Sequence, residues 1–337
     1  MQPKASFTPI LLALLSLAAP ALAQQNERFP REITLYVGTE PGGGYDLNAR
    51  MVARHMARHL PGNPTIIVQN MPGAGGLKLA NYLYSVAPRD GSAFGILGPT
   101  VLLDPLLGGQ ASQFDAQKFT LLGSSANEVS TCIAWHTAKA QSMDALMTNE
   151  LVVAATGPTS VSGLYPRVMN VMLGTHFKVV QGYNSSAEAL LAMERGENEG
   201  FCGLGWTNLQ QRPDWFEQGR VKVLVQLGLA KHKDHPDVPL VMDYAQNIID
   251  AQVLELVFAP QIFARPFIAP PDLPEERAAW LRLAFYATID DPEFILDATR
   301  QKLEPELVKG DQIRYLLGRL YGFAPQIVGR AKQALQQ

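Results

Sequence analysis

Three consecutive glycines are the first residues whose type and spacing could do chemistry. The stretch PGGGYD, residues 41–46, lies between a short β-rich run at 33–37 and a helical pattern that begins near Tyr45. Glycines let the backbone approach a ligand closely, and the free N–H groups at a helix start favour an anion. Neither nucleotide motif fits, because Leu47 replaces the last glycine of a dinucleotide fingerprint and Gly44 replaces the lysine of a P-loop. Taken alone, the loop is better explained as a tight turn.

Two pairs of histidines have a spacing that metal ligands can use. His55 and His59 are four residues apart on the first predicted helix, as zinc ligands can be. However, Met56 stands where a metalloprotease has its glutamate and three arginines share the helix, so we interpret this side as a solvated helix edge. His232 and His235 lie in a charged, proline-containing loop and are interpreted as surface residues. The sequence therefore predicts no metal site.

Hydroxyl and aromatic side chains beside the predicted loops are the remaining candidates. Tyr45 begins a helix, where its hydroxyl offers both a donor and an acceptor to a ligand. Trp206 follows a buried-type run, and lining a cleft or filling a core both remain open for it. Ser160 and Ser162 follow another such run, but no G-x-S-x-G occurs and no sequence pattern supplies a base. We therefore expect no catalytic residue and no cofactor.

The elements that must position these residues occur in two matched sets. Each set alternates apolar runs, loops rich in small residues and helical patterns, which is typical of a parallel α/β lobe. In the first set, runs at 33–37, 65–68 and 93–97 alternate with helices from Tyr45 and over 77–86. In the second, runs at 151–156, 177–181 and 200–204 alternate with helices over 161–173 and 187–195. Ligands of open α/β sheets bind at the carboxyl ends of strands, so both sets offer candidate ligand loops.

Residues 1–23 have the pattern of a secretory signal peptide. Lys4 precedes an apolar run at 9–19, and Ala21, Leu22 and Ala23 form an A-x-A cleavage site. No later run offers the roughly 18 uninterrupted apolar residues that a membrane span needs. The sequence therefore predicts a soluble protein exported to the periplasm, and a retained N-terminal anchor is the alternative.

Length, charge and cysteine content limit the class of protein. The chain after residue 23 exceeds the usual size of one core, so we expect two lobes, with crossings near 124–130 and 248–258. The formal charge of −3, from 28 basic and 31 acidic residues, argues against a nucleic-acid partner. Cys132 and Cys202 are too few for a disulfide-built scaffold, and whether they form a single bridge is left open.

The motifs together resemble a known family, the extracytoplasmic receptors of tripartite tricarboxylate transporters, often called the Bug family. The resemblance covers essentially the whole chain after the signal peptide. It rests on PGGGYD at 41–46 followed by Arg50, NMPGAGG at 70–76, PRDG at 88–91 and GYNSSAEALLAMERGENEG at 182–200. Each motif alone is weak, but their order behind a signal peptide is specific.

The resemblance implies a bilobed type II periplasmic-binding fold, which is an α/β fold of two parallel-type sheets flanked by helices, with a ligand cleft between the lobes. With the expected crossings, residues 24–126 and 252–337 form lobe 1 and residues 127–251 form lobe 2. Positions that match the family motifs imply a ligand site, to which we add Trp206. These positions are Gly43, Gly44, Tyr45, Asp46, Asn70, Gly73, Ala74, Gly75, Gly76, Pro99, Thr100, Thr159, Ser160, Tyr183, Asn184 and Ser185.

The family is expected to hold a small carboxylate with loop backbone, hydroxyl groups and ordered water. We therefore expect amide donors at the mouths of the glycine loops to bind the anion without a buried cation. The chain departs from the family pattern at Tyr45, where threonine is usual, at Thr159, where a second glycine is usual, and in the GYNSS turn at 182–186. These departures lie in the ligand loops, so the identity of the solute does not carry over.

The leading hypothesis is a monomeric periplasmic receptor that captures a di- or tricarboxylate, or another small organic acid, by cleft closure. It would deliver this acid to the membrane subunits of a tripartite transporter. Two other classes remain open. One is an exported enzyme that acts on a similar acid through Asp46 or Ser160, and the other is a sensory receptor that presents its bound ligand to a membrane kinase.

Overall fold

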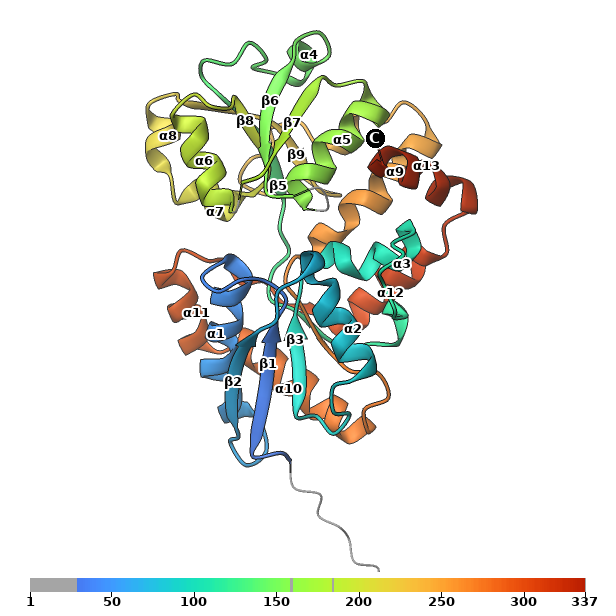
Figure 1. Cartoon of the computed structure of the whole chain (residues 1–337). Coiled ribbons are helices and arrows are strands. Elements are labelled where there is room, and N and C mark those ends of the chain that lie inside the picture. The colour runs from blue at the N-terminus through green and yellow to red at the C-terminus, as the bar shows by residue number, and fades with distance from the viewer. Residues whose placement is uncertain (1–28, 158–159, 184, 337) are drawn as a thin grey trace, which may run out of the picture.

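The computed structural model describes residues 29–157, 160–183 and 185–336, and it shows two α/β lobes joined by extended segments (Figure 1). In these ranges, no helix combines the length and the apolar composition that crossing a bilayer requires. The expected signal peptide at 1–23 lies outside the described residues, and so do the site candidates Thr159 and Asn184.

A six-stranded mixed sheet forms the centre of the lower lobe in Figure 1. Its strands in chain order are β1 (Glu32–Val37), β2 (Thr65–Asn70), β3 (Ala93–Ile96), β4 (Thr120–Ser124), β10 (Pro266–Ala269) and β11 (Val308–Lys309). They are arranged in the spatial order β11-β4-β10-β3-β1-β2. β1 pairs in parallel with β2 and β3, whereas β10 is antiparallel to β3 and β4. Every residue of β3 and β10 is buried, as expected for central strands covered on both faces.

Helices cover both faces of this sheet. The helices of this lobe are α1 (Gly44–Met56), α2 (Leu77–Ser85), α3 (Asp104–Leu107), α10 (Glu275–Ile289), α11 (Pro292–Arg300) and α12 (Gly310–Tyr321). The predicted apolar face of α1 is confirmed, because Ala49, Val52 and Met56 are buried in one core cluster with residues of β1 and α10. The helix therefore holds the preceding glycine loop at the end of β1.

The upper lobe contains a five-stranded mixed sheet in the order β7-β6-β8-β5-β9. Its strands are β5 (Ser130–Trp135), β6 (Leu151–Ala155), β7 (Phe177–Gln181), β8 (Gly200–Gly205) and β9 (Val221–Leu227), and its helices are α4 (Met143–Leu146), α5 (Val161–Leu173), α6 (Ser186–Glu194), α7 (Trp206–Gln210) and α8 (Pro213–Glu217). β6 is parallel to β7 and β8, and β5 is antiparallel to β8 and β9. The predicted α/β fold class is confirmed, with mixed rather than wholly parallel sheets.

Three stretches connect the lobes within the described residues. Residues 125–129 lead from β4 to β5, and a second segment leads from α9 (Ile248–Phe258) to β10. These two segments are hydrogen-bonded together, since the N–H of Ala264 donates to the Ala126 carbonyl over 3.1 Å. The third, residues 322–324, joins α12 on the lower sheet to α13 (Pro325–Gln336), which packs on α5 and α9 (Figure 1). The lobe boundaries near residues 126 and 252 stay predictions.

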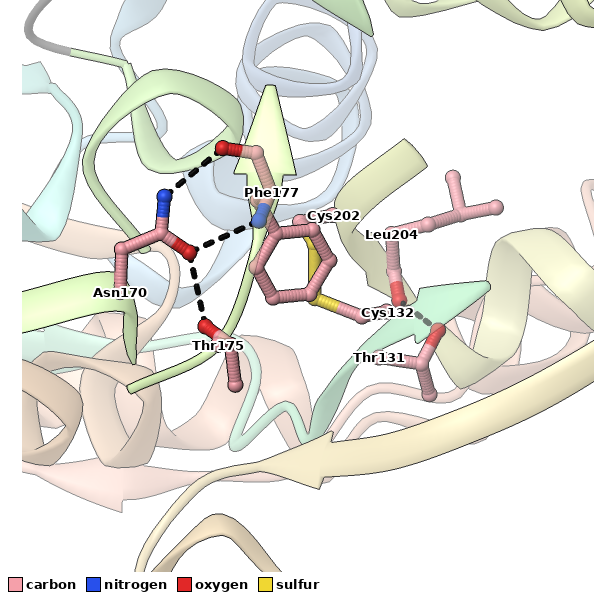
Figure 2. Close-up of a disulfide and its surroundings, with 7 residues drawn as sticks. All are labelled: Thr131, Cys132, Asn170, Thr175, Phe177, Cys202 and Leu204. Atoms are coloured by element: carbon pink, nitrogen blue, oxygen red, sulfur yellow. Dashed lines mark hydrogen bonds between the residues drawn. A yellow bond between two sulfur atoms is a disulfide. The ribbon is translucent and has the colours of Figure 1, made fainter. Parts of the chain in front are cut away.

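Cys132 and Cys202 form a disulfide inside the upper lobe (Figure 2). They occupy opposite positions on the antiparallel strands β5 and β8, and both side chains are fully buried. Beside the bridge, the Thr131 hydroxyl donates to the Leu204 carbonyl over 2.9 Å. The pairing that the sequence left open depends on β5, a strand that the sequence did not predict.

His55 and His59 face helix α11 instead of solvent. The Nε2 of His55 lies 3.0 Å from Asp297 and that of His59 lies 2.8 Å from Asp291. Each aspartate also pairs with an arginine: Asp297 with Arg54 of α1, and Asp291 with Arg58, which follows α1. The interpretation as a solvated helix edge is therefore wrong, because these side chains attach α1 to α11. In the part of the chain that the structure describes, no group of three His, Cys, Asp or Glu side chains could hold a metal ion.

Removal of the disulfide is expected to destabilise the protein. A Cys132→Ala, Cys202→Ala double variant lacks a crosslink between residues 70 positions apart, which contributes about 4 kcal/mol in a chain-entropy account. Urea unfolding should show the loss as a lower midpoint. Reduced wild-type protein is the matched control and should unfold like the variant. Equal midpoints for oxidised wild type and variant would contradict the prediction.

The contact between α1 and α11 is expected to weaken in acid. The Arg54 and His55 side chains lower the pKa of Asp297 to about 2. Burial raises the pKa of Asp291, but the Glu293 N–H and the side chains of His59 and Arg58 outweigh it and bring the value to about 2. Both pKa values lie below the usual 3.8, so the ionised aspartates stabilise the folded protein. This contribution is complete above about pH 4 and is lost as pH falls towards 2.

An Asp291→Asn, Asp297→Asn variant tests this linkage, since asparagine at 291 can still cap α11. Its melting temperature should lie below that of wild type at pH 7, and the difference should shrink towards pH 2. Asp272→Asn is the control, because its aspartate is 77% exposed in an ion pair with Arg89 that is expected to contribute little. A difference between wild type and double variant that did not change with pH would refute the prediction.

Candidate functional site

The strand ends of both sheets face the segments that connect the lobes. In the lower sheet, β4 runs in the same direction as β3, since β10 is antiparallel to both, and it ends where the first crossing begins. In the upper sheet, Gly205 at the end of β8 pairs with Ser130 at the start of β5, and β6 is parallel to β8. The strand-to-helix loops of the two lobes therefore face each other, as Figure 1 shows.

Asp46 fixes the shape of the first glycine-rich loop. Its buried carboxylate accepts hydrogen bonds from the Gly42 N–H and from Nε of Arg50, each over 2.9 Å. Its second oxygen accepts a 3.0 Å bond from Nδ2 of Asn70. Burial raises the pKa of Asp46, but these donors outweigh it and hold that pKa below its usual range. Asp46 and Asn70 therefore brace the loop through bonds within the protein.

Each of the two glycine-rich loops of the lower lobe leads directly into the start of a helix. α1 begins at Gly44 without a side-chain cap, and α2 follows Gly76, also without one. Gly76 has a φ of 105°, which favours glycine, and a Cβ there would also lie close to the Val101 side chain, at 3.3 Å. The first N–H groups of each helix lack partners within the helix and favour an anion.

An arginine whose side chain is only 15% exposed lies beside the first loop. The guanidinium of Arg265 stands 4.6 Å from the ring centre of Tyr45, and its Nη2 lies 3.2 Å from Oε1 of Glu128. Burial lowers the pKa of Arg265, but Glu128 and Tyr45 together outweigh burial, and the pKa rises above its usual value. Burial is also the main cause of the raised pKa of Tyr45. A mostly buried cation therefore lies beside the predicted loop, and the expectation from the sequence that an anion is bound without one stays a prediction.

Tyr165 of α5 extends this polar group to the upper lobe. Its hydroxyl accepts a 2.6 Å bond from Nε2 of Gln261, whose Oε1 accepts a 2.8 Å bond from the Ser130 hydroxyl. Burial, with smaller contributions from Tyr45 and Glu128, raises the pKa of Tyr165 well above its usual range. The polar group where the lobes meet thus contains Tyr45, Glu128, Tyr165, Gln261 and Arg265.

Serines cap the two upper helices whose starts face the cleft. The Ser160 hydroxyl accepts from the Gly163 N–H over 3.2 Å and donates to the Gly157 carbonyl over 2.8 Å. Ser185 caps α6 in the same way through the Glu188 N–H. Tyr183, just before α6, is half-buried against the core cluster that contains Trp206.

Trp206 is buried at the start of α7. Its ring stacks on His235 with centroids 3.8 Å apart, and its Nε1 donates to Gln226 over 3.3 Å. His232 also packs near the indole, so the interpretation of these two histidines as simple surface residues is wrong. Burial and the neighbouring His232 lower the pKa of His235. Trp206 both fills a core and borders a cavity, the two possibilities left open from the sequence.

Two cavities at the junction are bordered by a few of the predicted site residues. One of about 310 Å³ is bordered by Ala74, Gly75 and Thr100, and Pro99 is buried next to Thr100. The other, of about 430 Å³, is bordered by Trp206 and Glu128. The ligand-binding roles of all these residues stay predictions.

Sequence reasoning missed Arg265 and Glu128. Arg265 is the only charged residue in the run 256–271, and such an isolated charge in an apolar segment is a signal that could have been used. Glu128 carries no comparable signal, since only the fold brings it beside Arg265.

Comparison with known proteins gives one sequence relative and several similar structures. No protein-family model matches the chain. The chain is 24% identical over 316 residues to a Cupriavidus necator protein described as "UPF0065 protein in gbd 5'region", which covers 89% of this chain and 88% of that protein.

Solved structures agree with the fold. A TctC solute-binding protein from Polaromonas superposes with a TM-score of 0.65 at 18% identity, covering 90% of this chain and 98% of that one. MatC from Rhodopseudomonas palustris, solved with bound malate, superposes with a TM-score of 0.65 at 19% identity, covering 90% and 99%. The resemblance to the Bug and TctC receptors inferred from the sequence is thereby confirmed, and the chain has the bilobed fold of periplasmic solute-binding proteins.

Proposed function

We propose that the protein is a periplasmic receptor that binds a small organic acid between its lobes and passes it to the membrane subunits of a tripartite transporter. The observation that carries this proposal is the facing arrangement of the strand-to-helix loops, with uncapped starts of α1 and α2 on one side and serine-capped helices on the other. Such loops offer several amide and hydroxyl donors to one carboxylate.

The donors available are sufficient for receptor affinity. A hydrogen bond to a charged group contributes about 1.5–3 kcal/mol and a helix start about 0.3–1 kcal/mol. Micromolar binding requires about −8 kcal/mol, which a few such donors reach together with the positive charge of Arg265. Because Glu128 already balances part of that charge, Arg265 supports an anion without leaving an unpaired cation in the empty cleft.

The structure gives less support to an enzyme. Both oxygens of Asp46 are bonded within the loop, and the Ser160 hydroxyl is bonded as a helix cap. Neither candidate reactive group is therefore presented as a free nucleophile or base. Recovery of an unchanged mass for each bound acid would agree with a receptor, and a changed mass would support the enzyme.

Binding of an organic acid is expected to raise the melting temperature. A ligand present at 100 times its dissociation constant stabilises a folded protein by about 2.7 kcal/mol. A panel of aliphatic and aromatic mono-, di- and tricarboxylates, followed by calorimetry on any hit, tests this. The proposal fails if no acid in the panel shifts the melting temperature or gives binding heat.

Asp46→Asn is expected to weaken acid binding about tenfold, because loss of its charge-assisted bonds releases the first loop. Calorimetry with the best acid from the panel measures the effect. The matched control is Asp90→Asn, since Asp90 likewise accepts bonds from Ser92, in the turn that precedes β3 at the other end of the sheet. Equal affinities for the two variants would show that the loop brace is not needed.

A further inference from the structure

The cavity of about 310 Å³ has walls from both lobes. It is bordered by the loop before α2 and by α3 below, and by α5, α9 and α13 above (Figure 1). Most of its wall is aliphatic, including Leu77, Val101, Leu107, Leu164, Val257 and Leu335. This volume lies at the lower end of the range for small-molecule sites.

The cavity begins where the predicted carboxylate donors are. Ala74, Gly75 and Thr100 border it directly, next to the uncapped start of α2. An acid group held at this loop therefore has the aliphatic wall within reach of the rest of the molecule. Burial of an apolar body against such a wall adds affinity in proportion to the buried area.

The charged residues that border the cavity offer no excess positive charge to a second carboxylate. Asp104 borders the cavity, and its buried Oδ2 is without a hydrogen-bond partner among the described residues. A diacid would place another negative charge in the same low-dielectric space as this carboxylate. Arg167, the one basic residue among those that border the cavity, keeps its charge while its Nε donates to the Gly163 carbonyl over 2.8 Å, and the negative charge of Asp104 balances it.

We propose that this cavity binds the apolar body of a monocarboxylate, such as a medium-chain or arylalkanoic acid, whose acid group lies at residues 73–76. The inference rests on the proposed receptor function and specifies its substrate class. It distinguishes this chain from MatC, which was solved with malate.

Calorimetry with straight-chain acids tests the proposal. From butanoate to octanoate, each added methylene should tighten binding about fourfold until the cavity is full. The α,ω-diacid of the same length should bind at least about tenfold more weakly than each monoacid, because its second charge enters an apolar space. Affinity that does not change with chain length, or tighter binding of the diacids, would overturn the proposal.

Leu107→Trp should fill the cavity and weaken octanoate binding at least about tenfold. Butanoate binding should change less than about threefold. Leu164→Trp, on the opposite wall, is a second filling variant should the first fail to fold. Leu283→Trp, at a position that is 63% exposed on α10, is the matched control and should leave both acids unchanged. If a folded filling variant lost equal affinity for butanoate and octanoate, the hydrocarbon tail of the acid would lie outside this cavity. That result would refute the proposal.

The outcomes also separate this inference from the receptor function. If diacids or tricarboxylates bind well and the filling variants do not discriminate by chain length, the receptor function stands and the cavity proposal fails. If no acid of any class binds, the receptor function fails and the substrate class fails with it.

Discussion

The arrangement of the site depends on the reversal of one strand in each sheet where the chain crosses between the lobes. β5 enters the upper sheet antiparallel to β8, and β10 enters the lower sheet antiparallel to β3 and β4. Because of these reversals, the carboxyl ends of the remaining central strands point at each other from opposite lobes. Without them, the glycine-rich and serine-containing loops would lie at distant ends of the molecule.

The crossing segments also bring opposite charges together where the two lobes meet. Arg265 and Glu128 come from different crossings, and each would be costly to bury alone. Together with Tyr45 they form a compact polar group between otherwise apolar cores. In the proposed receptor, backbone donors would define where an anion lies, and the partly balanced guanidinium of Arg265 would make the local potential more favourable for it.

Local patterns were enough to predict the repeated elements. The helix over 161–173 was predicted to the residue, since Ser160 caps its start and Gly174 ends it with a φ of 73°. β4, β5, β10 and β11 were missed, because no glycine loop and helix follow them in the repeating order. The pairing of Cys132 with Cys202 and the contact of Arg265 with Glu128 depend on these strands and crossings. They arise from tertiary contacts between distant segments, which periodicity and spacing do not encode.

The third connection, between α12 and α13, has a mechanical consequence. Two adjacent crossings alone define a single axis about which the two lobes could rotate as rigid bodies. α13 is attached to the lower lobe through residues 322–324 yet packs on α5 and α9, and it also touches α3. This strap lies away from the axis, so it limits the amplitude of the swing and favours a sliding of α13 over α3.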